Sequence, residues 1–315
     1  MTGQASTGRG PLRPLREVLA APTWPGTVER PPAERRLGAG YDTAWSRPPA
    51  ARFGRALVLD NLTRPALRLL AAPHVSGLER LEALYGPVVF AANHSSHLDT
   101  ALVLAALPVR FRHRCVVAAA ADYFFDRHWK AVASSLALAT IPFERGRVSR
   151  QGTDLAAELL DQGWSVVIFD EGGRSPDGWG QRFRGGAAYL AKRAAVPVVP
   201  VHLHGVRPLL PKGGNRLRPG SVDVRFGTPL RPLAAAQAGA RPEDARRFAA
   251  RIEEAVAVLA DEAATDWWQA RRRAAEGVTP DVRGPASSPW RRAWDLPEHA
   301  RTDVRRRRLG RAAPW

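Results

Sequence analysis

Short apolar runs alternate with amphipathic stretches through the middle of the chain. The runs typical of buried strands cover residues 87–93, 114–121, 140–145, 164–170 and 196–203. Helical spacing of apolar residues between them predicts helices over 96–107, 124–139, 149–163 and 185–195. A later run, 221–230, has the pattern of an edge strand. Strands that alternate with helices predict an α/β fold with a largely parallel central sheet flanked by helices.

The segments on either side of this core have other patterns. Residues 53–73 predict an N-terminal amphipathic helical hairpin interrupted at Pro65. Phe248, Ile252, Val256 and Leu259 recur at helical spacing and predict one long C-terminal helix over 242–275. The expected organisation is a disordered Pro/Arg-rich segment at 1–51, a main domain at 52–235, a C-terminal helix at 236–278, and a disordered Arg/Trp-rich tail at 279–315.

The charge of the chain is unusual, with 47 basic and 30 acidic side chains and a formal net charge of +17. Such a field favours a polyanionic partner, either an anionic membrane surface or a nucleic acid, although a GC-rich genome would also write many arginines. The tail, with "RRRR" at 305–308 and several tryptophans, is either a solvated segment or an interfacial anchor. Cys115 is the single cysteine, which excludes an intrachain disulfide and fits a reducing compartment. No apolar run reaches the length of a membrane span, and no signal peptide is recognisable, so we expect a cytoplasmic protein, peripheral on the inner face of the cell membrane.

The stretch "NHSSHLD", residues 93–99, places two histidines and an aspartate between two buried elements. If His94 precedes the helix and Asp99 lies in its first turn, with Ser95 or Ser96 as N-cap, the two side chains can meet. Asp99 would then hold one imidazole nitrogen and leave the other as a general base for a hydroxyl or thiol. The alternatives are a polar cap with a structural histidine, or His97 as the base.

Two further strand ends carry polar groups. "IPFERGR" supplies Arg145 after one strand, and "FDEGGRS" supplies Glu171, Gly172, Gly173 and Arg174 after another. The carboxyl ends of parallel strands line the ligand crevice of an open sheet, so these residues are expected beside His94. Arginines there suit a phosphate, and the glycines allow close approach of the backbone.

Together these stretches resemble the glycerolipid acyltransferases related to 1-acylglycerol-3-phosphate acyltransferases, over about residues 55–232. The matching positions, in four blocks, are Asn93, His94, Ser96 and Asp99; Phe143 and Arg145; Phe169, Glu171, Gly172, Arg174 and Ser175; and Pro197 and Pro200. Asp170 stands where the family usually has proline, and Gly173 where it has threonine.

The resemblance implies transfer of a fatty acyl group from acyl-CoA or acyl-carrier protein to a hydroxyl of a lysophospholipid, most simply 1-acylglycerol-3-phosphate. It implies His94 and Asp99 as catalytic residues and no metal or other cofactor. The implied substrate-binding residues are Asn93, Ser96, Phe143, Arg145, Glu171, Gly172, Gly173 and Arg174. The expected partners are these substrates and an anionic membrane surface, with no nucleic acid.

Three other functions compete with this one. The chain could acylate a different lipid or alcohol, or it could be a non-catalytic lipid- or nucleic-acid-binding protein, which the arginines alone would explain. A serine hydrolase is disfavoured, because Ser165 lies within a predicted strand and the G-x-S-x-G elbow is absent from the sequence.

Overall fold

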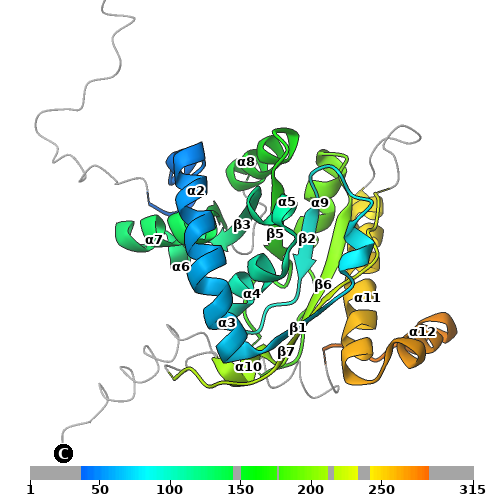
Figure 1. Cartoon of the computed structure of the whole chain (residues 1–315). Helices are drawn as coiled ribbons and strands as arrows, with labels where there is room; N and C mark the ends of the chain where they lie inside the picture. The colour runs from blue at the N-terminus through cyan, green and yellow to red at the C-terminus, as the bar shows by residue number, and fades with distance from the viewer. Residues whose placement is uncertain (1–36, 145–149, 176, 212–215, 233–241, 284–315) are drawn as a thin grey trace, which may run out of the picture. The chain divides into compact units, whose positions relative to one another are not determined.

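A seven-stranded sheet forms the centre of the computed structural model, which describes residues 37–144, 150–175, 177–211, 216–232 and 242–283 (Figure 1). The spatial order of the strands is β1-β7-β6-β2-β5-β3-β4, and every neighbouring pair is parallel except β6 and β7. The strands are β1 (Pro73–Ser76), β2 (Val89–Ala92), β3 (Cys115–Ala120), β4 (Thr140–Phe143), β5 (Ser165–Phe169), β6 (Val198–His204) and β7 (Val222–Phe226). The predicted α/β fold is confirmed, whereas β1 was not predicted.

Helices cover both faces of the sheet. They include α4 (Leu98–Ala106), α5 (Val109–Arg112), α6 (Ala121–Phe124), α7 (His128–Leu138), α8 (Arg150–Asp161), α9 (Gly186–Arg193) and α10 (Val206–Leu209). Side chains of β2 alternate between two cores, as the pleat of a strand requires. Phe90 packs in the core that contains α4, and Val89 in the core that contains α8 and α9. The strands are therefore apolar on both sides, which explains their continuous apolar runs.

The N-terminal amphipathic segment is one helical rod, so the predicted hairpin is wrong. Helix α2 (Pro49–Val58) continues through a π-helical turn, η3 (Leu59–Thr63), into α3 (Arg64–Ala71) (blue in Figure 1). Pro65 has no amide hydrogen to continue the α-helical ladder. The chain widens into the π-turn just before this proline and does not reverse.

The predicted disorder of residues 1–51 is wrong for the part that the structure describes. Two short turns, η1 (Gly38–Gly40) and η2 (Ala44–Ser46), precede α2. The ring of Tyr41 packs on Phe125 at 5.6 Å between centroids, and the amide of Gly38 donates to the carbonyl of Phe125. Pro49 occupies the first turn of α2, where a missing amide hydrogen costs nothing. Residues 1–36 lie outside the described part of the chain.

The predicted single C-terminal helix is two helices, α11 (Pro242–Ala264) and α12 (Trp267–Glu276). Asp266 has extended backbone (φ −155°), and its side chain accepts a hydrogen bond from the amide of Gln269 at 2.9 Å. This is the geometry of an N-cap, so Asp266 starts a new helix where apolar periodicity alone suggested continuation. Of the predicted tail, residues 279–283 are described, and the remainder, 284–315, lies outside the described residues.

No helix among the described residues combines the length and the apolarity that a crossing of the bilayer requires.

Phe90 gives a test of this core. Its side chain is fully buried, with edge-to-face contacts to Phe111 and Phe226 at 5.6 and 6.3 Å between centroids. We expect Phe90→Ala to lower the free energy of unfolding by about 3–5 kcal/mol in urea titration, because it removes a ring and leaves a cavity. Tyr85→Ala, at a site that is 95% exposed, should change it by less than about 0.5 kcal/mol. Equal effects of the two variants would contradict the packing described here.

Candidate active site

The turn between β2 and α4 is organised around the carboxylate of Asp99. One of its oxygens, Oδ2, lies 2.9 Å from Nδ1 of His94 and accepts hydrogen bonds from the backbone amides of Ser95 and Ser96 at 2.6 and 2.8 Å. Asp99 is fully buried in the first turn of α4. The predicted contact between His94 and Asp99 is therefore confirmed.

The start of α4 differs slightly from the prediction of Ser95 or Ser96 as N-cap. The helix begins at Leu98, and His97 holds the cap position without a side-chain cap hydrogen bond. The capping hydrogen bonds are divided between two side chains. The Ser96 hydroxyl accepts from the amide of Leu98 at 3.3 Å, and the Asp99 carboxylate accepts from the amides of Ser95 and Ser96. The turn is thus both a helix cap and the support of a histidine.

Both the imidazole and the backbone of His94 are held by neighbouring residues. Its ring stacks on Phe169 with 4.3 Å between centroids, and its side chain is 16% exposed. Its amide donates to Oε1 of Glu171 at 3.3 Å, and its carbonyl accepts from the amide of Ser175 at 2.8 Å. With Nδ1 facing Asp99, Nε2 is the ring nitrogen that can meet a ligand in the adjoining cavity.

Asn93 and Ser96, both predicted to bind substrate, hold the turn to the rest of the fold. The Asn93 amide group exchanges two hydrogen bonds with the backbone of Leu203, at 2.8 and 3.0 Å. The hydroxyl of Ser96, a fully buried residue, donates to the carbonyl of Leu210 at 2.9 Å. Neither residue lines the cavity, so the structure gives both a supporting position instead of a ligand contact.

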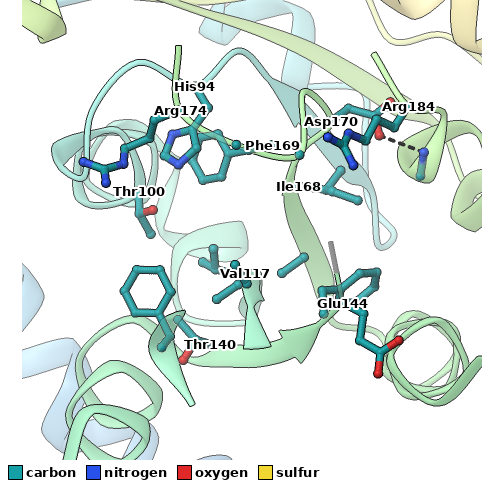
Figure 2. A pocket seen from close by; sticks show the side chains of 18 of the residues that line it. His94, Thr100, Val117, Thr140, Glu144, Ile168, Phe169, Asp170, Arg174 and Arg184 are labelled. Carbon is teal, nitrogen blue, oxygen red and sulfur yellow. Dashed lines mark hydrogen bonds between the residues drawn. The ribbon is translucent and has the colours of Figure 1, made fainter. Parts of the chain in front are cut away.

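A cavity of about 230 Å³ opens beside His94, at the carboxyl ends of β3, β4 and β5 (Figure 2). Gly172, Gly173 and Arg174 contribute to its lining, beside His94 as expected. The lining is mainly apolar and includes Val117, Leu138, Phe143 and Ile168. Thr140 and Glu144 also line it, on the side of Val117 away from Arg174 (Figure 2). Because β3 carries a run of alanines, from Ala118 to Ala120, the strand leaves room there that larger side chains would fill.

Arg184 also lines the cavity and was not predicted. It lies on the other side of Phe169 from Arg174 (Figure 2), and its Nε donates to the carbonyl of Glu171 at 3.3 Å. A Cβ on Gly172, whose φ is +72°, would come within 2.4 Å of that Nε. Gly172 is therefore needed both for the left-handed backbone and for the close passage of Arg184. The two arginines of "QRFRGG" are visible in the sequence, but the sequence does not show that one of them reaches the cavity.

The other predicted residues are placed as follows. Glu171 is buried at 2% exposure and turns toward the His94 backbone, outside the cavity lining. His97, the alternative base, lines the cavity, and its Nε2 lies 3.0 Å from the hydroxyl of Tyr123. Arg145 lies outside the described residues. Ser165 is buried in β5, where its hydroxyl accepts from the amide of Val88, so it is no candidate nucleophile.

Asp170, the departure from the family pattern, faces α9. Its carboxylate accepts hydrogen bonds from the amides of Gly185, Gly186 and Ala187 at 3.2, 2.7 and 3.2 Å. A negative group at a helix N-terminus is favourable, but the residue is only 3% exposed. Burial raises the pKa of Asp170 to about 6, against the lowering effect of the three amides.

Among the described residues, no three His, Cys, Asp or Glu side chains come together in an arrangement that could hold a metal ion.

Comparison with known proteins agrees with this arrangement. Residues 72–204 match the family model named Acyltransferase. The chain is 31% identical over half of its length to a chloroplastic 1-acyl-sn-glycerol-3-phosphate acyltransferase of Brassica napus, and 30% identical over 57% of its length to the human 1-acyl-sn-glycerol-3-phosphate acyltransferase alpha. The matches span 44% and 61% of these two relatives.

A solved structure supports the same relationship. The 1-acyl-sn-glycerophosphate (LPA) acyltransferase PlsC from Thermotoga maritima superposes with a TM-score of 0.52 at 25% identity. The superposition covers 68% of this chain and 82% of that one.

Asp170 gives a prediction about pH. The folded chain holds the Asp170 proton more tightly than the unfolded chain, whose pKa is near 3.8. The contribution of Asp170 to stability is therefore greatest below about pH 4 and is lost as the pH rises through 6. Relative to Asp170→Asn, whose amide oxygen can still accept from α9, the parent should lose about 2–3 kcal/mol of unfolding free energy between pH 4 and 7. A constant difference across this range, in urea titrations at each pH, would contradict the buried placement.

Proposed function

We propose that the chain transfers a fatty acyl group from a thioester to a hydroxyl of a lysophospholipid, most simply 1-acylglycerol-3-phosphate, because residues 72–204 match the acyltransferase family model. The observation that carries the proposal is the His94–Asp99 pair at the wall of a mainly apolar cavity that Arg174 and Arg184 also line. The two curated relatives described above are named for this activity.

His94 acts as the general base in this proposal. Its Nε2 takes the proton of the acceptor hydroxyl as that oxygen attacks the thioester carbonyl carbon. The C–S bond of the tetrahedral intermediate then breaks, the ester is released, and the leaving thiolate takes the proton back from His94. Asp99 fixes the tautomer with hydrogen on Nδ1 and stabilises the imidazolium, because its carboxylate faces that nitrogen at 2.9 Å.

The charged and the apolar residues of the cavity suit the phosphate and the acyl chain of the substrates. Arg174 and Arg184 offer guanidinium groups to the acceptor phosphate, and Arg145 is assigned the same task from the sequence. The apolar part of the lining, which includes Val117, Leu138 and Ile168, suits a fatty acyl chain. The residues present supply base, orientation and charge, so the proposed reaction requires no metal or redox cofactor.

The proposed substrate also indicates where in the cell the protein acts. A lysophospholipid resides in a membrane, and a chain with net charge +17 is drawn to an anionic surface. We therefore place the protein in the cytoplasm, peripheral on the inner face of the cell membrane, with no nucleic-acid partner.

The base assignment is tested by removing either member of the pair. His94→Ala and Asp99→Asn should each lower kcat/KM by about 10²–10⁴-fold with lysophosphatidate and acyl-CoA, because proton transfer loses its base or its correct tautomer. The measurement is steady-state acyl transfer followed by lipid mass spectrometry, with circular dichroism to check folding.

A second histidine–aspartate pair serves as the matched control. His74 on β1 lies 3.3 Å from Asp223, far more exposed and outside the cavity lining. His74→Ala should retain the parental rate. Folded His94→Ala protein with near-parental activity would sink the assignment.

The arginines are tested through the acceptor. Arg174→Ala and Arg184→Ala should each raise the KM for lysophosphatidate about 10–100-fold, since each removes a charge-assisted hydrogen bond to phosphate. The KM for monoacylglycerol, which has no phosphate, should change little. Arg193→Ala, an exposed arginine paired with Asp154, is the control. A rise confined to the KM of the acyl donor would show that the phosphate is not bound here.

A further inference from the structure

Two adjacent tryptophans of α12 are exposed on the surface. Trp267 and Trp268 are 53% and 70% exposed, whereas Ala270 is fully buried. At 100° per residue, Arg272 lies one turn beyond Trp268 on the same face, where it pairs with Glu276 at 2.9 Å. The outer face of α12 therefore presents two indoles and the guanidinium group of Arg272.

The inner face of α12 is fastened to α11 by ion pairs. Arg273 reaches Asp261 at 2.7 Å, and Arg271 lies 4.0 Å from Glu262. Both carboxylates are nearly buried, and Glu262 also pairs with Arg225 of β7 at 3.2 Å. These contacts fix the rotation of the helix about its axis, so the indoles cannot turn inward against α11.

The helix is encoded as a separate element. Asp266 caps its first turn, and Gly277, with φ of +71°, ends it. It is ten residues long, and its sequence between the caps is polar apart from the tryptophans and alanines. Low overall apolarity with an aromatic and basic face is the pattern of a helix that lies in a membrane interface. It is unlike a helix waiting for a core, which would present aliphatic side chains.

The position of α12 also fits a membrane contact. Glu262 and its partner Arg225 stand next to the carboxyl end of β6, since Arg225 pairs in register with His202. The candidate active site lies at the carboxyl ends of β3, β4 and β5, and both α12 and α10, which follows β6, are in the lower half of Figure 1. Helix α12 therefore lies toward the carboxyl edge of the sheet, the edge that also carries the candidate active site.

We propose that the Trp267, Trp268 and Arg272 face of α12 binds the headgroup region of an anionic phospholipid bilayer. Indoles favour this zone because their rings are apolar and their N–H groups can reach water or phosphate. The exposed guanidinium group of Arg272 adds attraction to anionic lipid. The proposal supplies a docking element for the membrane location proposed above, and its binding test is independent of catalysis.

Vesicle binding by the full chain is the first test. Trp267→Ser/Trp268→Ser should weaken co-sedimentation with phosphatidylglycerol/phosphatidylcholine vesicles at least tenfold, because two half-exposed indoles no longer enter the interface. Tyr85→Ala, an exposed aromatic ahead of β2 and thus at the other edge of the sheet, should bind as the parent does. Arg272→Gln should weaken binding to anionic vesicles and leave binding to pure phosphatidylcholine unchanged.

A local reporter makes the test specific to α12. Cys115 is the single cysteine and is buried, which raises the pKa of its thiol to about 12, so it resists labelling. A nitrobenzoxadiazole dye on Trp268→Cys should brighten and shift to the blue on addition of anionic vesicles. The same dye on Tyr85→Cys should not respond.

Several outcomes would overturn the proposal. The first two are unchanged vesicle binding by the double variant and a dye at position 268 whose fluorescence does not change when vesicles are added. The third is a dye that responds to single-stranded oligonucleotide instead of vesicles. The fourth is an indole-dependent dimer, seen by light scattering, in place of membrane binding. Activity on a short-chain, water-soluble lysophosphatidate should be parental in the double variant. Loss of vesicle binding with that activity retained separates failure at the membrane from failure of the catalytic proposal.

Discussion

The buried carboxylate of Asp99 is the constraint on which the site depends. A carboxylate that is fully removed from water must be compensated by donors, and here the donors are two backbone amides, one imidazole nitrogen and, at 3.4 Å, the Ser95 hydroxyl. The amides of Ser95 and Ser96 can reach the carboxylate only if the chain turns tightly between β2 and α4. The turn that supplies these donors to Asp99 therefore also sets the position and tautomer of His94. The same hydrogen bonds stabilise the turn and hold the imidazole.

The parallel sheet joins this turn to the second polar loop. Because β2 and β5 are neighbours in register, the residues after Ala92 and Phe169 leave the sheet side by side. The side chain of Glu171 accepts a hydrogen bond from the amide of His94, and the carbonyl of His94 accepts one from the amide of Ser175. The two loops are thus cross-linked through the backbone of the histidine itself. Substitutions in "FDEGGRS" are expected to move His94 as well as any ligand that Arg174 holds.

Sequence reasoning succeeded where a local pattern and a fold rule agreed. The contact between His94 and Asp99 followed from helix geometry, and the gathering of loops followed from parallel strand order. It failed where a tertiary contact decided the outcome. Apolar spacing runs through residues 242–275, yet Asp266 breaks the helix with an N-cap. The short strand β1 exists because β7 offers it an edge. Arg184 reaches the cavity because Gly172 has no side chain to block it, and no pattern within "QRFRGG" predicts that close approach.

The departures from the family pattern have unequal consequences. Successive residues leave β5 toward opposite sides, so Asp170 turns to the N-terminus of α9 while Glu171 turns to the His94 backbone. Asp170 replaces a proline, and its carboxylate is used to hold three amides of the fold at the cost of burying a charge. Gly173, in contrast, lines the cavity beside Arg174 and adds no side chain to it. In the proposed reaction, this space receives the acceptor headgroup. Under that proposal, selectivity among acceptors depends on Gly173 and the two flanking arginines, and much less on Asp170.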